Sequence, residues 1–293
     1  MLEIKHFSNF DSVGKGLSIG IGKFDGIHIG HKKIIEEVVK KGKSKRIIPS
    51  IFTFKNFPVE FFISSWEEKL NLFENLGIEL CIWCDYEEIS FWQPFEFIEY
   101  LECISVKSIV VGNGFQFGSH RKGTIEDLKK KFDVLIVQPV IVEGEIVNST
   151  KIREYLKNGD IEKVNKLLGR NFSFKGKVIT GNSRGKNLGF PTANLSLFNN
   201  IKIKEGVYGA WVKFDNNLYK GALSIGNCPT FYNDENKIEV HIINFDKIIY
   251  GEILEIYPIL RIRDQKKFKN LEELKENIKK DINFIYENLT YPF

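Results

Sequence analysis

The segment LSIGIGKFDGIHIGH, residues 17–31, decides the fold of the first half of the chain. It opens with the apolar run Leu17–Ile21, which is typical of a buried strand, and continues into a glycine-rich turn. Apolar residues then recur at helical spacing, at Ile34, Ile35, Val38 and Val39, and Gly42 is expected to end this helix. A strand, a turn and a helix in this order predict the first unit of an open α/β sheet.

The same alternation continues to about residue 170, which predicts a Rossmann-like domain with a parallel sheet. Residues 151–168 form a predicted pair of short helices divided by Asn158 and Gly159, and we expect them to bridge two domains. The further expected strands cover 47–54, 78–84, 109–111 and 134–138, with helices at 66–76, from Pro94 and at 124–131.

Beyond Gly169 the pattern changes to β-rich segments joined by turns. This change predicts an all-β barrel or sandwich, closed by a C-terminal helix with Leu271, Leu274, Ile278 and Ile282 on one face. The expected strands are 174–180, 207–214, 219–225, 238–245 and 253–261. Because 293 residues exceed the usual size of one core, we expect domains at 1–168 and 169–293.

Composition restricts the classes of function. Hydrophobic residues make up 43% of the chain, and the net charge of +4 falls short of the concentrated positive field typical of nucleic-acid binders. The densest basic run, residues 40–46, is expected to be a solvated loop. No apolar stretch approaches the ~20 residues that span a bilayer, and no signal-peptide pattern opens the chain. We therefore expect a cytoplasmic protein with no membrane or nucleic-acid partner.

Two of the four cysteines, Cys81 and Cys84, have the CxxC spacing of metal and redox sites. They lie in an apolar run, and no second Cys or His pair follows nearby. We expect buried thiols there.

The first candidate site is the turn after the first strand. At the carboxyl end of a parallel strand, helix N–H groups face outward, and Gly22 and Gly26 let a phosphate approach the backbone. His28 and His31 can then reach one triphosphate and stabilise the charge that develops on it. The alternative is that the two histidines only cap the helix.

A second segment, residues 148–153, follows the last strand of this half. Ser149 or Thr150 is a natural helix N-cap, and Arg153 can bind a phosphate through two hydrogen bonds. Such a hexapeptide taken alone is more often an ordinary capped helix, but together with the first turn it predicts a second phosphate-binding segment.

The third candidate site lies in the β-rich half. Gly181, Gly185 and Gly189 form a glycine loop whose amides could bind phosphates, although such turns also occur without ligands. Thr192 and Asn194 offer oxygen ligands suited to Mg²⁺, with a polar turn as the alternative. Glu239 could accept a proton from an alcohol that attacks ATP, or could simply face solvent.

The first two segments resemble the HxGH and STxxR signatures of the nucleotidylyltransferase superfamily, in contexts similar to the adenylyltransferase module of bacterial bifunctional riboflavin kinase/FAD synthetases. The segment VGNGFQFG, residues 111–118, is similar to that family's VGxDFxFG. The resemblance implies that the FMN phosphate attacks the α-phosphate of ATP and releases pyrophosphate. The implied ATP contacts are Gly22, Phe24, Asp25, Gly26, His28, His31, Ser149, Thr150 and Arg153.

Residues 171–293 resemble the riboflavin kinase module, with matches to GxxxGRxLGFPTAN, to a GVY segment at 206–208 and to ExH at 239–241. The resemblance implies Glu239 as the catalytic base and Mg²⁺ held by Thr192 and Asn194. Arg263 and Phe268 correspond to the segment near the flavin pocket. The implied ATP contacts of this module are Gly181, Gly185, Gly189, Pro191, Thr192 and Asn194.

Several residues depart from the family pattern. In the first half Lys23 replaces Asn or a small residue, Phe57 replaces His, Gly114 replaces Asp and Gln116 replaces Arg. Departures in the second half are milder, because none of them removes the expected base or metal ligands. They are Lys186 for Arg, Ser224 for Asn, Cys228 for Arg and Gln265 for Glu.

The expected function is thus phosphorylation of riboflavin to FMN and adenylylation of FMN to FAD, with riboflavin, FMN and ATP as small-molecule substrates. We expect the protein to be a monomer or a weak oligomer. One alternative is a riboflavin kinase whose first module only binds nucleotide. The other is a non-catalytic flavin-binding regulatory protein.

Overall fold

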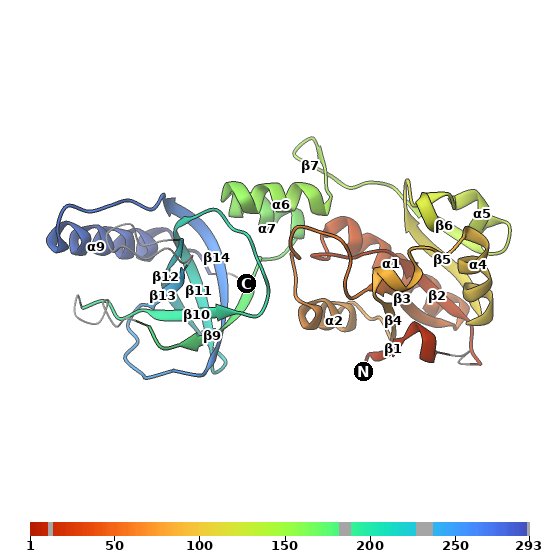
Figure 1. Ribbon diagram of the computed structural model, residues 1–293, viewed down its shortest axis with the longest axis horizontal. Coiled ribbons are helices and arrows are strands. Elements are labelled where there is room, and N and C mark those ends of the chain that lie inside the picture. Colours follow the sequence, from red (N-terminus) through yellow and green to blue (C-terminus); the bar gives the residue numbers. More distant parts are fainter. Residues whose placement is uncertain (11–13, 182–188, 227–236, 292–293) are drawn as a thin grey trace. The chain divides into compact units, whose positions relative to one another are not determined.

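The computed structural model describes residues 1–10, 14–181, 189–226 and 237–291 (Figure 1). Contacts between residues divide the chain into two compact units. The first comprises Met1–Glu60 and Trp66–Asn148, and the second comprises Phe61–Ser65 and Ser149–Phe293. The helices α6 (Ser149–Asn158) and α7 (Ile161–Leu168) appear as predicted, and their contacts group them with the second unit. The domain boundary at residues 168 and 169 stays a prediction.

The first unit is built on a six-stranded sheet in the order β1-β4-β3-β2-β5-β6, in which every pair is parallel. This confirms the predicted Rossmann-like class. The strand β1 was not predicted, because its four residues are half-buried or exposed at the sheet edge and lack an apolar run. The strands are β1 (Glu3–His6), β2 (Leu17–Ile21), β3 (Ile48–Phe54), β4 (Leu80–Cys84), β5 (Val106–Gly112) and β6 (Asp133–Val137).

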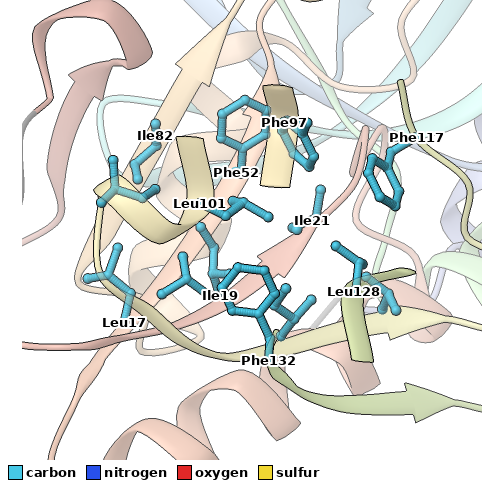
Figure 2. Packing of buried hydrophobic residues seen from close by; sticks show 14 of the residues in the cluster. Leu17, Ile19, Ile21, Phe52, Ile82, Phe97, Leu101, Phe117, Leu128 and Phe132 are labelled. Atoms are coloured by element: carbon cyan, nitrogen blue, oxygen red, sulfur yellow. The ribbon is translucent and has the colours of Figure 1, made fainter. Parts of the chain in front are cut away.

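Helices bury both faces of this sheet. On one face, α1 (Ile29–Lys45) and α2 (Trp66–Asn75) pack Ile35 and Phe73 against the sheet. On the other face, α4 (Pro94–Cys103) and α5 (Ile125–Lys129) contribute Phe97, Leu101 and Leu128 to the cluster around Ile19 and Phe52 (Figure 2). Two faces buried in this way explain why all five residues of β2 are buried, including Ser18 and Gly20 between the apolar positions. Between these elements lie the short α3 (Tyr86–Ile89) and the hairpin of β7 (Ile141–Val142) and β8 (Glu145–Ile146).

The prediction that Gly42 ends the first helix is wrong, because α1 continues to Lys45. Gly42 is buried where the helix passes Pro49, and a Cβ there would lie only 2.7 Å from the proline ring. The basic run is therefore mostly helical and not a loop, and Lys41 and Lys45 both form ion pairs with Asp133. The helix is instead ended by Arg46, which has a left-handed backbone (φ 56°).

The second unit contains a closed antiparallel barrel in the order β10-β13-β12-β11-β14-β9. The sequence pattern allowed either a barrel or a sandwich, and the structure shows the barrel. Its strands are β9 (Phe174–Ile179), β10 (Ala193–Leu197), β11 (Gly206–Phe214), β12 (Asn217–Gly226), β13 (Lys237–Ile242) and β14 (Ile253–Arg263). The C-terminal helix α9 (Leu271–Asn288) packs Ile285 against Trp211 and Tyr257.

Three details of this unit correct the expectations. The strand β10 was not predicted; Asn194 near its start was expected only as an oxygen ligand or as part of a polar turn. The strand expected to reach residue 245 ends at Ile242, since Asn244 takes the left-handed backbone (φ 57°) that Asn tolerates. In α9, Leu271 is 49% exposed, and Ile285 one turn beyond the expected stripe is fully buried.

Both thiols of the CxxC spacing are buried in β4, as expected. Burial raises the pKa of Cys81 to about 12, so the thiol stays protonated. Among the described residues no group of three or more His, Cys, Asp or Glu side chains is arranged to hold a metal ion. None of the described helices combines the length and apolar character needed to cross a membrane.

Candidate active sites

The turn between β2 and α1 has a strained backbone held by buried side chains. Phe24 (φ 48°) and Ile27 (φ 37°) both lie in the left-handed region, which costs about 1 kcal/mol or more for a residue with a Cβ. Their side chains are buried in the core beneath α1. Such strain concentrates at functional sites, and here core packing maintains it.

The two histidines at this turn lie face to face. Their rings stack at 3.6 Å between centroids and 19° between planes. Nδ1 of His28 accepts a hydrogen bond from the His31 backbone N–H at 3.3 Å, so His28 is the N-cap of α1. Because Nδ1 is an acceptor, neutral His28 carries its proton on Nε2 and can donate it to a ligand. The capping role and the phosphate-binding role are therefore compatible.

His31 is a neutral donor at pH 7. Burial, reinforced by the neighbouring His28 and Lys69, holds its pKa well below the ordinary value. Its Nδ1 is buried and meets no hydrogen-bond partner among the described residues. A buried polar atom in this state is uncommon and frequently marks a site that a ligand completes.

Asp25 and Lys69 lie beneath the same turn, 1% and 2% exposed respectively. Burial lowers the pKa of Lys69, and the opposite charge of Asp25 raises it by a smaller amount. The resulting pKa of Lys69 is about 8. Lys69 was missed by the sequence analysis. The available signal was a lysine one turn before Phe73 on the apolar face of the predicted helix 66–76.

A cavity of about 380 Å³ opens beside the turn, at the carboxyl ends of β2 and β3 and in the loop after β5. Ligands bind at this position in open α/β sheets. Aromatic rings dominate its lining, and the charged groups there are the cations Lys23 and Arg121. The lining residues that carry rings or charge are Lys23, Phe52, Phe54, Tyr86, Trp92, Phe97, Phe115, Phe117 and Arg121, most of them missed from sequence.

The STKIR segment forms the first turns of α6, as expected. Ser149 and Thr150 are its first two residues, and Nε of Arg153 donates to the Phe61 carbonyl at 3.0 Å. The contacts of this segment group it with the second unit. Its participation in the site at the first turn stays a prediction.

In the barrel, β10 and β13 bring the predicted kinase residues together. Asn194 pairs with Glu239 across the two strands, and the Thr192 hydroxyl donates to the Glu239 carboxylate at 3.3 Å. Nδ1 of His241 lies 2.8 Å from the Pro191 carbonyl, which ties the end of the glycine loop to β13. Two oxygen groups and a carboxylate thus converge at one edge of the barrel.

The glycine loop is only partly described. Gly181 passes so close to Asn194 that a Cβ would lie 2.0 Å from its side-chain nitrogen, and Gly189 has a left-handed backbone (φ 85°). Gly185 lies outside the described residues, as do Lys186 and Cys228.

Arg263 and Phe268 lie together, with the guanidinium 5.6 Å from the ring centre. The same guanidinium binds both oxygens of the Asp281 carboxylate on α9, at 2.7 to 3.1 Å. Asp281 is 7% exposed, so this pair anchors the C-terminal helix to the barrel edge.

The chain combines a parallel α/β unit, which has two histidines at its first helix, with a barrel in which the Glu239 carboxylate lies beside Thr192 and Asn194. This combination defines a two-domain nucleotide-dependent transferase. The family model described as FAD synthetase matches residues 11–151, and that described as riboflavin kinase matches residues 168–289. The chain belongs to the family of bifunctional riboflavin kinase/FMN adenylyltransferases.

Curated relatives are similar over almost the whole chain. The bifunctional riboflavin kinase/FMN adenylyltransferase of Buchnera aphidicola subsp. Schizaphis graminum is 32% identical, covering 98% of this chain and 99% of the relative. The Bacillus subtilis enzyme of the same description is 33% identical over 90% of this chain and 89% of its own length. A crystal structure described as a macrolide-efflux protein from Streptococcus pneumoniae matches with a TM-score of 0.89 and 30% identity, covering 98% of this chain and 99% of that one.

Proposed function

We infer that this enzyme phosphorylates riboflavin to FMN with its barrel unit and adenylylates FMN to FAD with its α/β unit. The observation that carries this conclusion is the presence of both domains on one chain, each with its candidate catalytic side chains assembled. ATP is the second substrate of both reactions.

In the kinase reaction, Glu239 acts as the general base. Its carboxylate accepts the proton of the riboflavin primary alcohol as that oxygen attacks the γ-phosphate of ATP. Thr192 and Asn194 would hold Mg²⁺ together with the phosphates, and Gly181, Gly189 and Pro191 form the ATP side of the site. Two neutral oxygens beside one carboxylate fit Mg²⁺, which keeps several waters and binds few protein ligands. When bound, the ion neutralises charge on the phosphates.

In the adenylyl transfer, the FMN phosphate attacks the α-phosphate of ATP and pyrophosphate leaves, without a covalent intermediate. Nε2 of His28 and the neutral ring of His31 donate hydrogen bonds to the phosphate oxygens where charge develops. Gly22 and Gly26 admit the phosphates to the turn, and ATP contacts by Ser149, Thr150 and Arg153 stay predictions from the sequence.

The aromatic cavity holds the flavin ring of FMN. Phe54, Tyr86 and Trp92 supply flat apolar surfaces for stacking, and the volume of about 380 Å³ lies within the range of cofactor sites. Lys23 and Arg121 complement the phosphate.

The rival proposal, a kinase with a degenerate first module, rests on the departures from the family pattern. Two of these departures contact each other: the Lys23 ammonium lies 4.9 Å from the centre of the Phe57 ring. In the barrel, Gln265 donates to the Ser224 hydroxyl at 2.8 Å, which joins two other departures.

The deciding experiment incubates the purified chain with riboflavin, ATP and Mg²⁺ and separates the flavins over time. We expect FMN to form first and FAD to follow. FMN without FAD at long times would favour the kinase-only rival.

A Glu239→Gln variant tests whether the barrel is catalytic or only binds flavin. Loss of a general base lowers the rate by about 10²–10⁴-fold, so FMN formation should fall by that order while FAD formation from supplied FMN persists. FMN formation at the wild-type rate would remove Glu239 from its proposed role. A cytoplasmic location and a monomeric or weakly oligomeric state stay predictions.

A further inference from the structure

Lys69 is a buried charged side chain to which the adenylyl-transfer mechanism above assigns no role. It lies on α2, one turn before Phe73, and is 2% exposed. Phe73 packs against Phe24 of the phosphate-binding turn, with ring centres 5.6 Å apart. The inner face of α2 therefore supports this turn with both an apolar and a charged group.

The Lys69 ammonium joins the turn after β2 to the end of β3. Its Nζ donates to the Lys23 carbonyl at 2.8 Å and to the Phe54 carbonyl at 3.0 Å. The Thr53 hydroxyl donates to the same Lys23 carbonyl at 3.1 Å, and Thr53 is fully buried. The Lys23 carbonyl thus accepts two hydrogen bonds from beneath the turn.

These two bonds fix the orientation of one peptide group. In a planar trans peptide the carbonyl and the following N–H point in opposite directions. With the Lys23 carbonyl held toward Lys69, the N–H of Phe24 points away from the buried lysine. This constraint acts at the start of the strained residues Phe24 to Ile27, whose backbone needs support from outside the turn.

We propose that Lys69 and Thr53 are positioning residues for adenylyl transfer, which hold the Lys23–Phe24 peptide in the conformation that binds phosphate. This inference rests on the proposed function of the first unit. A buried ammonium is expensive where an apolar side chain would fill the same space, so a role limited to packing does not explain it. The pKa of Lys69, lowered to about 8 mainly by burial, reflects the same cost.

The test uses the full chain and measures both reactions. In Lys69→Met we expect kcat for FAD formation from FMN and ATP to fall by about tenfold or more, as for loss of a charged hydrogen-bond donor. The KM for ATP should change less than kcat, because oriented donors act mainly on the charge of the transition state. FMN formation from riboflavin should stay within about twofold, since the barrel has a separate core.

Tryptophan fluorescence confirms that the first unit of each variant is folded, since three of the four tryptophans, Trp66, Trp83 and Trp92, belong to that unit. Lys55→Met is the matched control. Lys55 follows β3 directly, is exposed, and places its ammonium 5.1 Å from the Trp83 ring centre. Both reactions of this control should proceed at the wild-type rate.

Two variants of Thr53 test the same positioning role even if Lys69→Met does not fold. Thr53→Val removes the hydroxyl at nearly constant volume and should lower FAD formation by about threefold or more. Thr53→Ser keeps the hydroxyl and should restore it. Wild-type rates of FAD formation in folded Lys69→Met and in Thr53→Val, or equal loss in Thr53→Val and Thr53→Ser, would overturn the inference. Absence of FAD formation by the wild type would instead overturn the proposed function.

Discussion

The ring of His28 illustrates how one residue serves structure and chemistry together. Its Nδ1 caps α1, and this hydrogen bond selects the tautomer with the proton on Nε2. The sequence analysis left helix capping and phosphate binding as alternatives. The geometry shows that one ring can do both, because the two nitrogens point in different directions.

Gly30 sets the position of this ring. A Cβ on Gly30 would lie 3.1 Å from Cε1 and Nδ1 of His28, closer than ordinary contact. We expect Gly30→Ala to shift the imidazole and lower FAD formation by about tenfold, as small displacements of oriented donors do, although alanine favours the helix. Unchanged FAD formation would contradict the importance of this ring position. Thermal unfolding of the variant, followed by tryptophan fluorescence, checks that its loss of activity is not a loss of fold.

Lys69 also predicts a pH dependence of stability. Its pKa is about 8 in the folded unit against an ordinary 10.5, so the unfolded chain binds more protons between these values. The contribution of Lys69 to stability is fully present above pH 10.5 and is lost as pH falls through 8. From pH 7 upward this group should raise the free energy of unfolding by up to about 3 kcal/mol. Urea unfolding at several pH values should show this rise in the wild type and not in Lys69→Met; parallel profiles would refute it.

At the scale of elements, β10 positions residues of the kinase site. The sequence analysis left oxygen ligands and a polar turn as alternatives for Thr192 and Asn194, and no strand was expected, yet Ala193–Leu197 close the barrel between β9 and β13. Asn194 gains its position opposite Glu239 from this pairing. This five-residue strand is stable here because its backbone groups are satisfied by neighbours on both sides.

Gly181 tests this arrangement. An added Cβ would lie 2.0 Å from the Asn194 side-chain nitrogen, so Gly181→Ala should displace Asn194 and lower FMN formation by about tenfold or more. Ser196→Ala, a change at an exposed position on β10, the strand of Asn194, is the control and should leave FMN formation unchanged. FAD formation from supplied FMN should be unaffected in both. FMN formation by Gly181→Ala at the wild-type rate would argue against Asn194 as an ATP or metal contact.

At the scale of the whole molecule, each unit has its own sheet, its own core and its own site. Such units are expected to lose activity separately when a site residue in one of them changes.

We therefore expect the double variant His28→Ala, His31→Ala to form FMN at the wild-type rate and no detectable FAD. Chromatography of the flavins after incubation with riboflavin and ATP measures both products at once. Loss of FMN formation as well would count against independent units.

The sequence by itself determined the order of the two folds, and it predicted candidate residues for both sites. Periodicity of 3.6 or 2 is local, so α1, β2 and every barrel strand except β10 could be predicted from neighbouring residues. The glycine and histidine spacing of the first turn and the Thr192 to Asn194 segment are also local patterns.

Only the tertiary structure decided what lies beneath and between these segments. Lys69 reaches the Lys23 carbonyl across 46 positions of sequence, and Thr192 reaches Glu239 across 47. The aromatic cavity likewise joins the ends of β2 and β3 with residues 114–121. These contacts follow from the parallel sheet and the closed barrel, because strand pairing and side-chain packing bring distant residues together, and no local period in the sequence records those distances.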